Sequence, residues 1–265
     1  MEDIQHSLDV ATRFLETVDL PKAVKSFEEE GLPLDLSRPV FDQVKEQSIV
    51  IGSQLAGFSS DVPVKLRPMI SNVFLLAQLV ADKKTQHAAS GSKQWYDTYL
   101  ETLTKVGWSV SGMSDAEQII SGSALEVHKE IIPVIVAALG PAAAAASTIV
   151  RVLEGLGNIS KDQPWITLFN RKSQRATANQ FQFSQTTMEG DTPVVTLVAF
   201  NLDARNAVTQ VLFFKFVSNK ASLSYFEEKL FANLKVLEHT EERIFKIVLD
   251  HISSNITELE ALGIS

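Results

Sequence analysis

Residues 131–150 form the longest stretch of the chain without a charged side chain, IIPVIVAALGPAAAAASTIV. Such a length is enough to cross a bilayer as one helix. However, Gly140 and Pro141 stand at its centre, and a proline inside a helix costs about 3 kcal/mol. Glycine just after a helix end and proline at the first helical position are both favoured. The pattern therefore predicts two helices in a hairpin, one over 115–139 with a kink at its proline and one over 141–156.

This predicted hairpin has three interpretations. It fits a tightly packed core hairpin, because the alanines at 142–146 allow another backbone to approach closely. It also fits a concealed hairpin that opens and enters a membrane, or a segment that spans a membrane permanently. The prediction carried forward is the buried hairpin, with the opening hairpin as its alternative.

Apolar residues recur at helical spacing through the first 157 residues. Besides the hairpin, this pattern predicts five helices, near residues 4–15, 23–27, 39–55, 60–84 and 95–108.

The period changes to that of strands after Lys161. A short strand is predicted over 164–169, followed by extended runs over 178–188, 193–201, 209–217 and 223–237. The composition of residues 189–191 predicts a hairpin turn. The run 223–237 fits both periods, and we interpret it as a strand. Thr240 is then expected to cap a closing helix.

Two of these strands are apolar at successive positions, over 194–200 and 211–217. A half-exposed antiparallel strand should alternate, so both faces of these strands must be covered. Helices on each face would do this, and so would an apolar cavity that holds a fatty chain. The candidate residues for lipid or membrane contact are Ile135, Leu139, Ala143, Ile149, Val198, Phe200, Phe214 and Phe216.

The segregation of helices and strands predicts an α+β fold. We expect an N-terminal multi-helix array with a central alanine-rich buried hairpin, then a roughly four-stranded antiparallel meander and a C-terminal helix. No flexible linker separates the parts, so a single intertwined domain over 1–265 is expected, with its helical part at 1–157 and its sheet and closing helix at 164–262.

The net charge of −8 argues against nucleic-acid binding and against electrostatic attraction to anionic lipid. The chain contains no cysteine, which excludes disulfides and thiolate chemistry. The N-terminus lacks a basic start followed by an apolar stretch, so we expect synthesis in a cytoplasm without a signal peptide. Release by a signal-independent route stays open.

The motifs of common enzymes are absent from the sequence. The five histidines are scattered without metal-ligand spacing, and no nucleophile elbow, phosphate loop or dinucleotide fingerprint occurs. We therefore expect neither a catalytic nor a metal site. The aromatic residues of 95–108 fit core packing or, as an alternative, a belt at a membrane boundary.

The segment WYDTYLETLTKVGW at 95–108, the alanine-rich hairpin, and the late segments TLVAFNL and VLFFKF together resemble the Erwinia virulence factor family. These are bacterial proteins associated with persistence in the insect gut. The resemblance implies an α+β fold, no enzymatic activity and a toxin-like role in a host. The family's buried fatty acyl group is attached through cysteine, and this chain has none. No functional residue is transferred.

The sequence thus leads to two hypotheses of function. The first is a non-enzymatic bacterial virulence or toxin-like protein that associates with a host membrane or lipid, with no cofactor other than a non-covalent fatty acid or lipid. The alternative is a soluble interaction module that binds an unidentified protein through its acidic surface.

Overall fold

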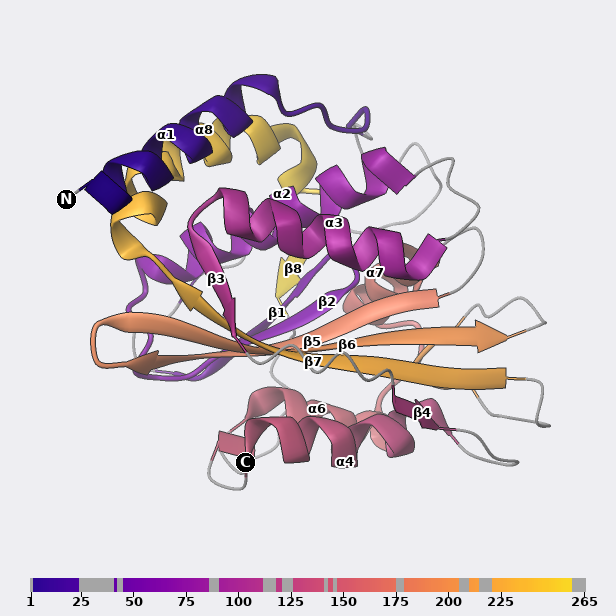
Figure 1. The fold of residues 1–265 in the computed structure, drawn as a ribbon. Helices are drawn as coiled ribbons and strands as arrows, with labels where there is room; N and C mark the ends of the chain where they lie inside the picture. The colour runs from indigo at the N-terminus through magenta and orange to yellow at the C-terminus, as the bar shows by residue number, and fades with distance from the viewer. Residues whose placement is uncertain are drawn as a thin grey trace.

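The computed structural model describes residues 2–23, 41, 45–85, 91–111, 118–120, 126–140, 143–144, 147–174, 179–204, 210–214 and 221–258. In these residues a mixed sheet lies between two layers of helices (Figure 1). The elements are α1 (Glu2–Thr17), β1 (Gln47–Ile51), β2 (Gln54–Phe58), α2 (Leu66–Thr85), α3 (Gly91–Lys105), β3 (Trp108–Ser111), β4 (Gln118–Ile120), α4 (Val127–Leu139), α6 (Thr148–Gly155), a 3-10 turn at Leu156–Asn158, α7 (Pro164–Ser173), β5 (Asn179–Glu189), β6 (Thr192–Ala204), β7 (Ala221–Ala232), α8 (Leu234–Ile252) and β8 (Ile256–Glu258).

The eight described strands follow the order β3-β7-β6-β5-β2-β1-β8, and β4 also pairs with β7. The long strands β5, β6 and β7 form an antiparallel meander, as predicted. The turn between β5 and β6 contains Gly190 with φ of +61°, a conformation that glycine adopts at little cost. Among the described pairs, β2 and β5 are the parallel one. The α+β class is confirmed.

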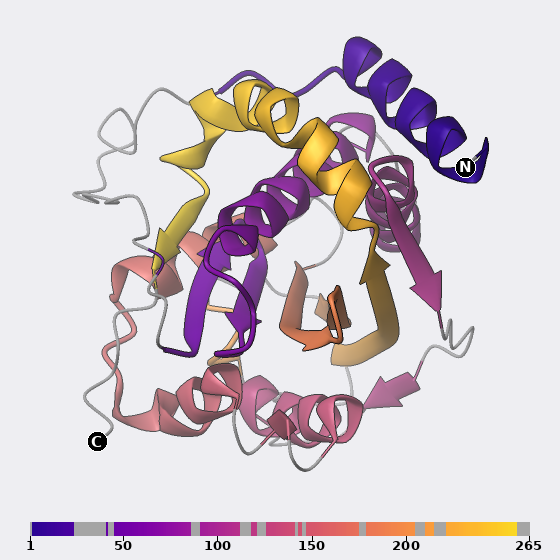
Figure 2. The same ribbon diagram turned by 90° about the vertical axis from the view of Figure 1, so that its left-hand side faces the viewer.

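Helices cover both faces of the meander (Figures 1 and 2). The upper layer holds α2, α3 and α8, with α1 packed on α8, and the lower layer holds α4 and α6. Along β6, Val195 and Leu197 join the apolar cluster of the upper layer, whereas Val198 and Phe200 join that of the lower layer. The prediction that this strand is covered on both sides is therefore confirmed.

The helix predicted over 39–55 is wrong in its described part. Residues 47–58 form the hairpin of β1 and β2, which turns at Gly52 with φ of +55°. Short apolar runs fit a buried strand as well as a helix. Pairing with β5 and β8, both more than 100 residues further along the chain, makes these residues strands. The helix predicted over 23–27 lies outside the described residues apart from Ala23, which is not helical.

Three predictions in the C-terminal half also need correction. Residues 164–173 form helix α7, which begins with a proline at its first position, where the missing N–H costs nothing. Residues 211–214 are a turn rather than a strand, and 215–217 lie outside the described residues. Helix α8 begins at Leu234, because the Asn233 side chain caps it by accepting a hydrogen bond from the Val236 N–H. Thr240 lies inside this helix.

The predicted hairpin is confirmed only in part. Its first helix, α4, begins at Val127 instead of Asp115, and residues 118–120 are strand β4. Its second helix is interrupted, because Ser147 has an extended backbone (φ −72°, ψ 120°) and α6 begins at the next residue. In the described part of the chain, no helix is long and apolar enough to span a membrane.

The sheet does not follow the division into a helical part at 1–157 and a sheet part at 164–262. Strands β1 to β4 come from the first part and pair with β5, β7 and β8 from the second. Helix α3 ends at Lys105, and Trp108 opens strand β3 rather than continuing the helix.

Candidate functional site

Most of the lipid candidates predicted from the sequence lie in or beside the lower layer. Four of them are buried in one apolar cluster between α4, α6, α7 and the sheet, namely Ile135, Ile149, Val198 and Phe200. Leu139 and Phe214 are partly buried at the margin of this cluster, and Ala143 lies beside Leu139 in a groove described below. Phe216 lies outside the described residues. The structure therefore brings these side chains together chiefly as packed core.

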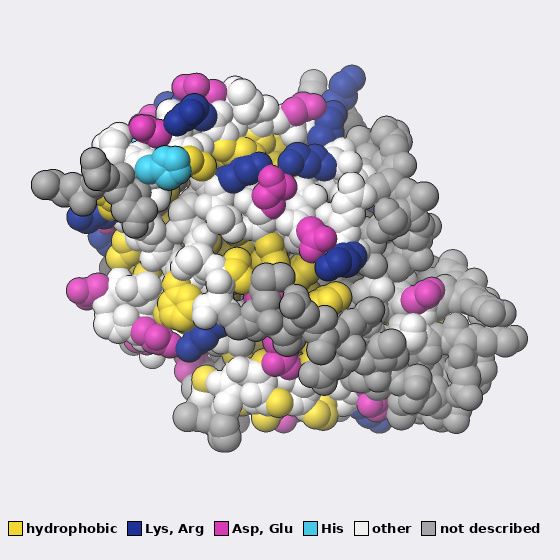
Figure 3. Space-filling view, viewed as in Figure 1, with side chains coloured by type: hydrophobic (Ala, Val, Ile, Leu, Met, Phe, Trp, Pro, Cys, Tyr) yellow, Lys and Arg dark blue, Asp and Glu magenta, His cyan; other side chains and the backbone are white. Residues whose placement is uncertain are grey.

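The outer surface of α4 is apolar and carries no charge after its first turn. Pro133 and Ala137 are exposed there, and Ile132, Val136 and Leu139 beside them are only partly buried. Figure 3 shows hydrophobic side chains reaching the surface of the lower layer. Outward side chains of a helix on a protein in water are usually polar or charged. This uncharged outer surface, made of residues 132, 133, 136, 137 and 139, is hereafter the α4 face.

Polar contacts hold the lower layer to the rest of the protein at the start of α6. The Ser147 hydroxyl donates to the Gln185 side-chain oxygen at 3.0 Å, and the hydroxyls of Ser48 and Thr148 are in hydrogen-bond contact. Arg151 forms an ion pair with Glu46 at 2.9 Å. These contacts attach α6 to β1 and β5.

Gly57 on β2 leaves the room that the Gln185 side chain occupies. A Cβ atom at position 57 would lie 2.5 Å from the Gln185 side-chain oxygen. The glycine is thus required by close packing, because a side chain there would displace the amide that Ser147 binds.

The start of α4 is hydrogen-bonded to the turn at residues 211–214. The Val127 N–H donates to the Phe214 carbonyl at 3.0 Å, and His128 Nδ1 lies 3.1 Å from the Leu212 carbonyl oxygen. The Glu126 carboxylate lies 2.9 Å from the Lys129 ammonium group. The charged residues of this helix all lie in its first turn.

A groove of about 460 Å³ lies between the C-terminal end of α4 and the sheet. Its helical side is apolar, with Ala138, Leu139 and Ala143, whereas its sheet side carries the polar and charged residues Gln185, Thr187, Glu189, Thr196, Glu227 and Lys229. Partial burial raises the pKa of the Glu227 carboxyl. The volume suits a small ligand, but a hydrocarbon chain would lie against the charged groups of the sheet side, including the ion pair of Lys229 with Glu189.

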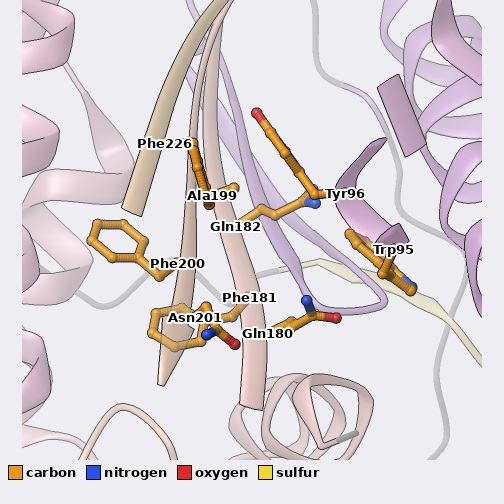
Figure 4. A pocket seen from close by; sticks show the side chains of 9 residues that line it. All are labelled: Trp95, Tyr96, Gln180, Phe181, Gln182, Ala199, Phe200, Asn201 and Phe226. Atoms are coloured by element: carbon orange, nitrogen blue, oxygen red, sulfur yellow. The ribbon is translucent and has the colours of Figure 1, made fainter. Parts of the chain in front are cut away.

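A second pocket lies between α3 and the sheet (Figure 4). Trp95 and Tyr96 line it from the helix, and Gln180 and Gln182 line it from β5. Its volume is about 20 Å³, far below the roughly 300 to 1,000 Å³ of ordinary ligand sites. The fatty-chain cavity predicted from the sequence therefore finds support neither here nor in the groove at Leu139.

The aromatic residues of α3 pack in the core. Trp95 stacks on Tyr99 with 5.5 Å between ring centroids and donates its indole N–H to Asp82 at 2.7 Å. Tyr96 stacks on Phe226, also at 5.5 Å. Burial, and next the charge of Glu228, raises the pKa of Tyr96. Of the two interpretations, core packing is the correct one for these residues.

The polar residues of the pocket beneath α3 were missed in the sequence, although a signal for them exists. The segment QFQFS at 180–184 alternates strictly, which places its polar side chains on the α3 side of β5 and its phenylalanines on the α4 side. As to metals, no group of three or more His, Asp and Glu side chains suited to a metal ion occurs among the described residues.

No protein-family model matches this chain, and no curated protein sequence does. The solved structures that are similar to it, all distantly, include the following three. A structure named "delta-endotoxin" has a TM-score of 0.41 and 12% identity, over 81% of this chain and 91% of the other. Activated Cyt2Ba from Bacillus thuringiensis subsp. israelensis has a TM-score of 0.31 and 13% identity, over 64% of this chain and 89% of the other. The Evf virulence factor has a TM-score of 0.30 and 13% identity, over 80% of this chain and 86% of the other.

The Evf structure is thus among the solved structures to which this chain is similar, in agreement with the resemblance in the sequence.

Proposed function

We propose that this protein is a non-enzymatic virulence or toxin-like protein that binds the surface of a host membrane through the α4 face. One observation carries the proposal: the outward side chains of this helix after its first turn are apolar or small, where a water-exposed helix would ordinarily present charges. A helix with an apolar outer surface gains free energy when that surface leaves water.

The length of α4 supports binding along the membrane surface rather than across it. The helix has 13 residues. At a rise of 1.5 Å per residue it is about 20 Å long, short of the roughly 30 Å of hydrocarbon in a bilayer. Lying flat, the helix would bury the side chains of Ile132, Val136 and Leu139 at the boundary of head groups and acyl chains.

The charge of the chain supports a preference for lipids without net charge. With a net charge of −8, the protein is repelled by anionic membranes. Binding that rests on apolar contact should depend little on salt concentration, because screening affects charges only. We therefore expect binding to phosphatidylcholine vesicles that is similar at low and high salt.

Flotation of the protein with phosphatidylcholine vesicles tests the proposal. Ala137 is exposed at the middle of the α4 face, so Ala137→Glu places one charge there with little effect on folding. The matched control is Gln94→Glu, the same charge change at an exposed position on α3 in the other layer. We expect Ala137→Glu to lower the binding constant about tenfold and the control to bind like the wild type. If the wild-type protein does not float, or if both variants bind equally, the proposal is wrong.

A second candidate function, the binding of a protein partner, is favoured by one feature of α8. Phe245 and Leu249 are 37% and 38% exposed, one turn apart on the outer side of this helix, and Glu241 and Glu242 are exposed near them. Capture of one protein in stoichiometric amount, lost in the Phe245→Ser variant and kept in Ala137→Glu, would support this function over membrane binding.

A further inference from the structure

A groove of about 680 Å³ lies at one end of the sheet, where β3 and β6 begin and β7 ends. Residues of α1 and of the last turn of α3 line it as well. Figure 2 faces this end of the molecule and shows α1 and α8 above the turn between β5 and β6, with β3 beside it. The volume lies within the roughly 300 to 1,000 Å³ of ordinary ligand sites. This groove is hereafter the sheet-end groove.

Polar side chains that water can reach line the sheet-end groove from three separate parts of the chain. His6 belongs to α1, Asp191 to the turn between β5 and β6, and Asn233 to the junction of β7 and α8, and all three are exposed. The Asn233 side-chain oxygen accepts from the Val236 N–H at 3.4 Å, so its amide nitrogen is left to donate. The Asp191 carboxylate has two oxygens that accept. The groove therefore presents a donor and a strong acceptor.

The strand register brings these two groups to the same place. Val194 on β6 pairs with Phe231 on β7. Asp191 comes three residues before Val194, and Asn233 comes two residues after Phe231. Because the strands are antiparallel, both residues leave the same end of the strand pair, and one ligand at that end can meet both.

An apolar wall stands beside the polar groups. It includes the half-buried side chains of Phe231 and Val10, with the buried Trp108 next to them. The Lys229 ammonium group lies over the Phe231 ring, 5.6 Å from its centroid, so a ligand meets the remaining surface of this ring. Aromatic rings attract positively polarised C–H groups. The groove thus suits a ligand that carries C–H groups and hydrogen-bonding groups side by side.

The charges of the lining favour a ligand without net charge. The lining contains one carboxylate, that of Asp191, and one ammonium group, that of Lys105. Lys105 is already paired with Glu101 at 2.5 Å and lies over the Phe14 ring, so it has little attraction left for an anion. An acyl chain, on the other hand, would take the polar groups out of water without hydrogen bonds in return.

We infer that the sheet-end groove is a binding site for a neutral carbohydrate. Two neighbouring hydroxyls of a sugar ring donate to the Asp191 carboxylate, and the Asn233 amide nitrogen donates to a hydroxyl oxygen. The C–H groups of the ring pack against Phe231. The groove belongs to α1, α3 and the end of the sheet, apart from the α4 face, so this inference does not rest on membrane binding.

An array of immobilised neutral mono-, di- and trisaccharides, probed with the labelled full chain, tests the inference. We expect binding to a neutral saccharide and competition by the same saccharide in solution. Asp191→Asn should weaken this binding about tenfold, because a hydrogen bond to a charged acceptor is replaced by one to a neutral acceptor. Asn233→Asp keeps an oxygen to cap α8 but replaces the donor nitrogen, and it should weaken binding at least as much.

The matched control is Asp162→Asn, the same change at an exposed position before α7 and outside the groove, which should bind like the wild type. Three outcomes overturn the inference: no binding to any neutral saccharide, binding that the soluble saccharide does not displace, and equal binding by Asp191→Asn and Asp162→Asn. Flotation of Asp191→Asn with phosphatidylcholine vesicles should match that of the wild type, so a failure here is distinguished from a failure of the α4 face.

Discussion

At the residue scale, Arg67 shows how this protein buries a charged group. The side chain is 0% exposed at the start of α2. Its guanidinium donates to the carbonyl oxygens of Val62, Lys45 and Ser59 and to the side-chain oxygen of Gln47. Because a buried charge is tolerated only when its donors are satisfied, this residue joins the start of α2 to the segment around β1 and β2.

The tyrosines lead to a prediction about pH. The chain has three, and the pKa values of Tyr96, Tyr99 and Tyr225 are all raised from the usual 10.0, chiefly by burial. The folded state thus favours the neutral phenol. The stability tied to these groups is fully present below pH 10, where the unfolded chain begins to ionise, and is lost as the pH rises further.

Ultraviolet titration checks this prediction. We expect little tyrosinate absorbance from the folded protein at pH 10, with Tyr225 ionising before the two more deeply buried tyrosines. The same chain in denaturant, as the control, should titrate normally. Reversible ionisation of all three groups near pH 10 in the folded protein would contradict the burial described above.

At the element scale, the joint between α3 and β3 depends on a glycine. Gly107 has φ of +93°, and a Cβ atom there would lie 2.6 Å from the Val236 Cβ on α8. Its carbonyl accepts a hydrogen bond from the Asn233 N–H at 2.9 Å, just before α8 begins. The glycine therefore lets the start of α8 pack closely against the end of α3.

We predict that Gly107→Ala lowers the free energy of unfolding by about 2 to 5 kcal/mol, from backbone strain and overpacking together. Chemical denaturation measures the change. Gly157→Ala is the control, because a Cβ atom at that glycine meets no described atom within 4 Å. Similar losses for the two variants would mean that the contact with Val236 does not decide the effect.

At the scale of the whole molecule, the question is whether the lower layer must leave the sheet to act. The hydroxyls of Ser48 on β1 and Thr148 on α6 touch, 100 residues apart in the chain. Since the natural chain has no cysteine, Ser48→Cys with Thr148→Cys introduces a single thiol pair. The disulfide would tether the layer and stabilise the fold by about 2 to 4 kcal/mol.

We expect the oxidised double variant to have a higher Tm than its reduced form and to float with vesicles equally well. The reason is that the α4 face already points outward when the layer is closed. The two single-cysteine variants are the controls. Binding that appears only after reduction would show that the layer has to open, and that its inner surface meets the membrane.

The long periodic patterns of this sequence determined much of the fold. Helical spacing over 60–84 and 95–108, and extended runs over 178–188 and 193–201, predicted the elements observed as α2, α3, β5 and β6, although the ends of these elements differ by up to six residues. Apolar residues at successive positions of β6 also revealed that both faces of the strand are covered. Such signals are local, since each element repeats its own period over several turns or pleats.

Tertiary structure alone decided whether the short elements became helices or strands, and which of the candidate side chains are buried or exposed. The apolar run at 47–58 became strands because β5 and β8 lie beside it, and Ser147 interrupts the second helix where its hydroxyl meets Gln185. The same packing turned Ile135 inward and left Ala137 exposed. These outcomes depend on contacts between residues far apart in the chain, which a local pattern of apolar and polar positions does not encode.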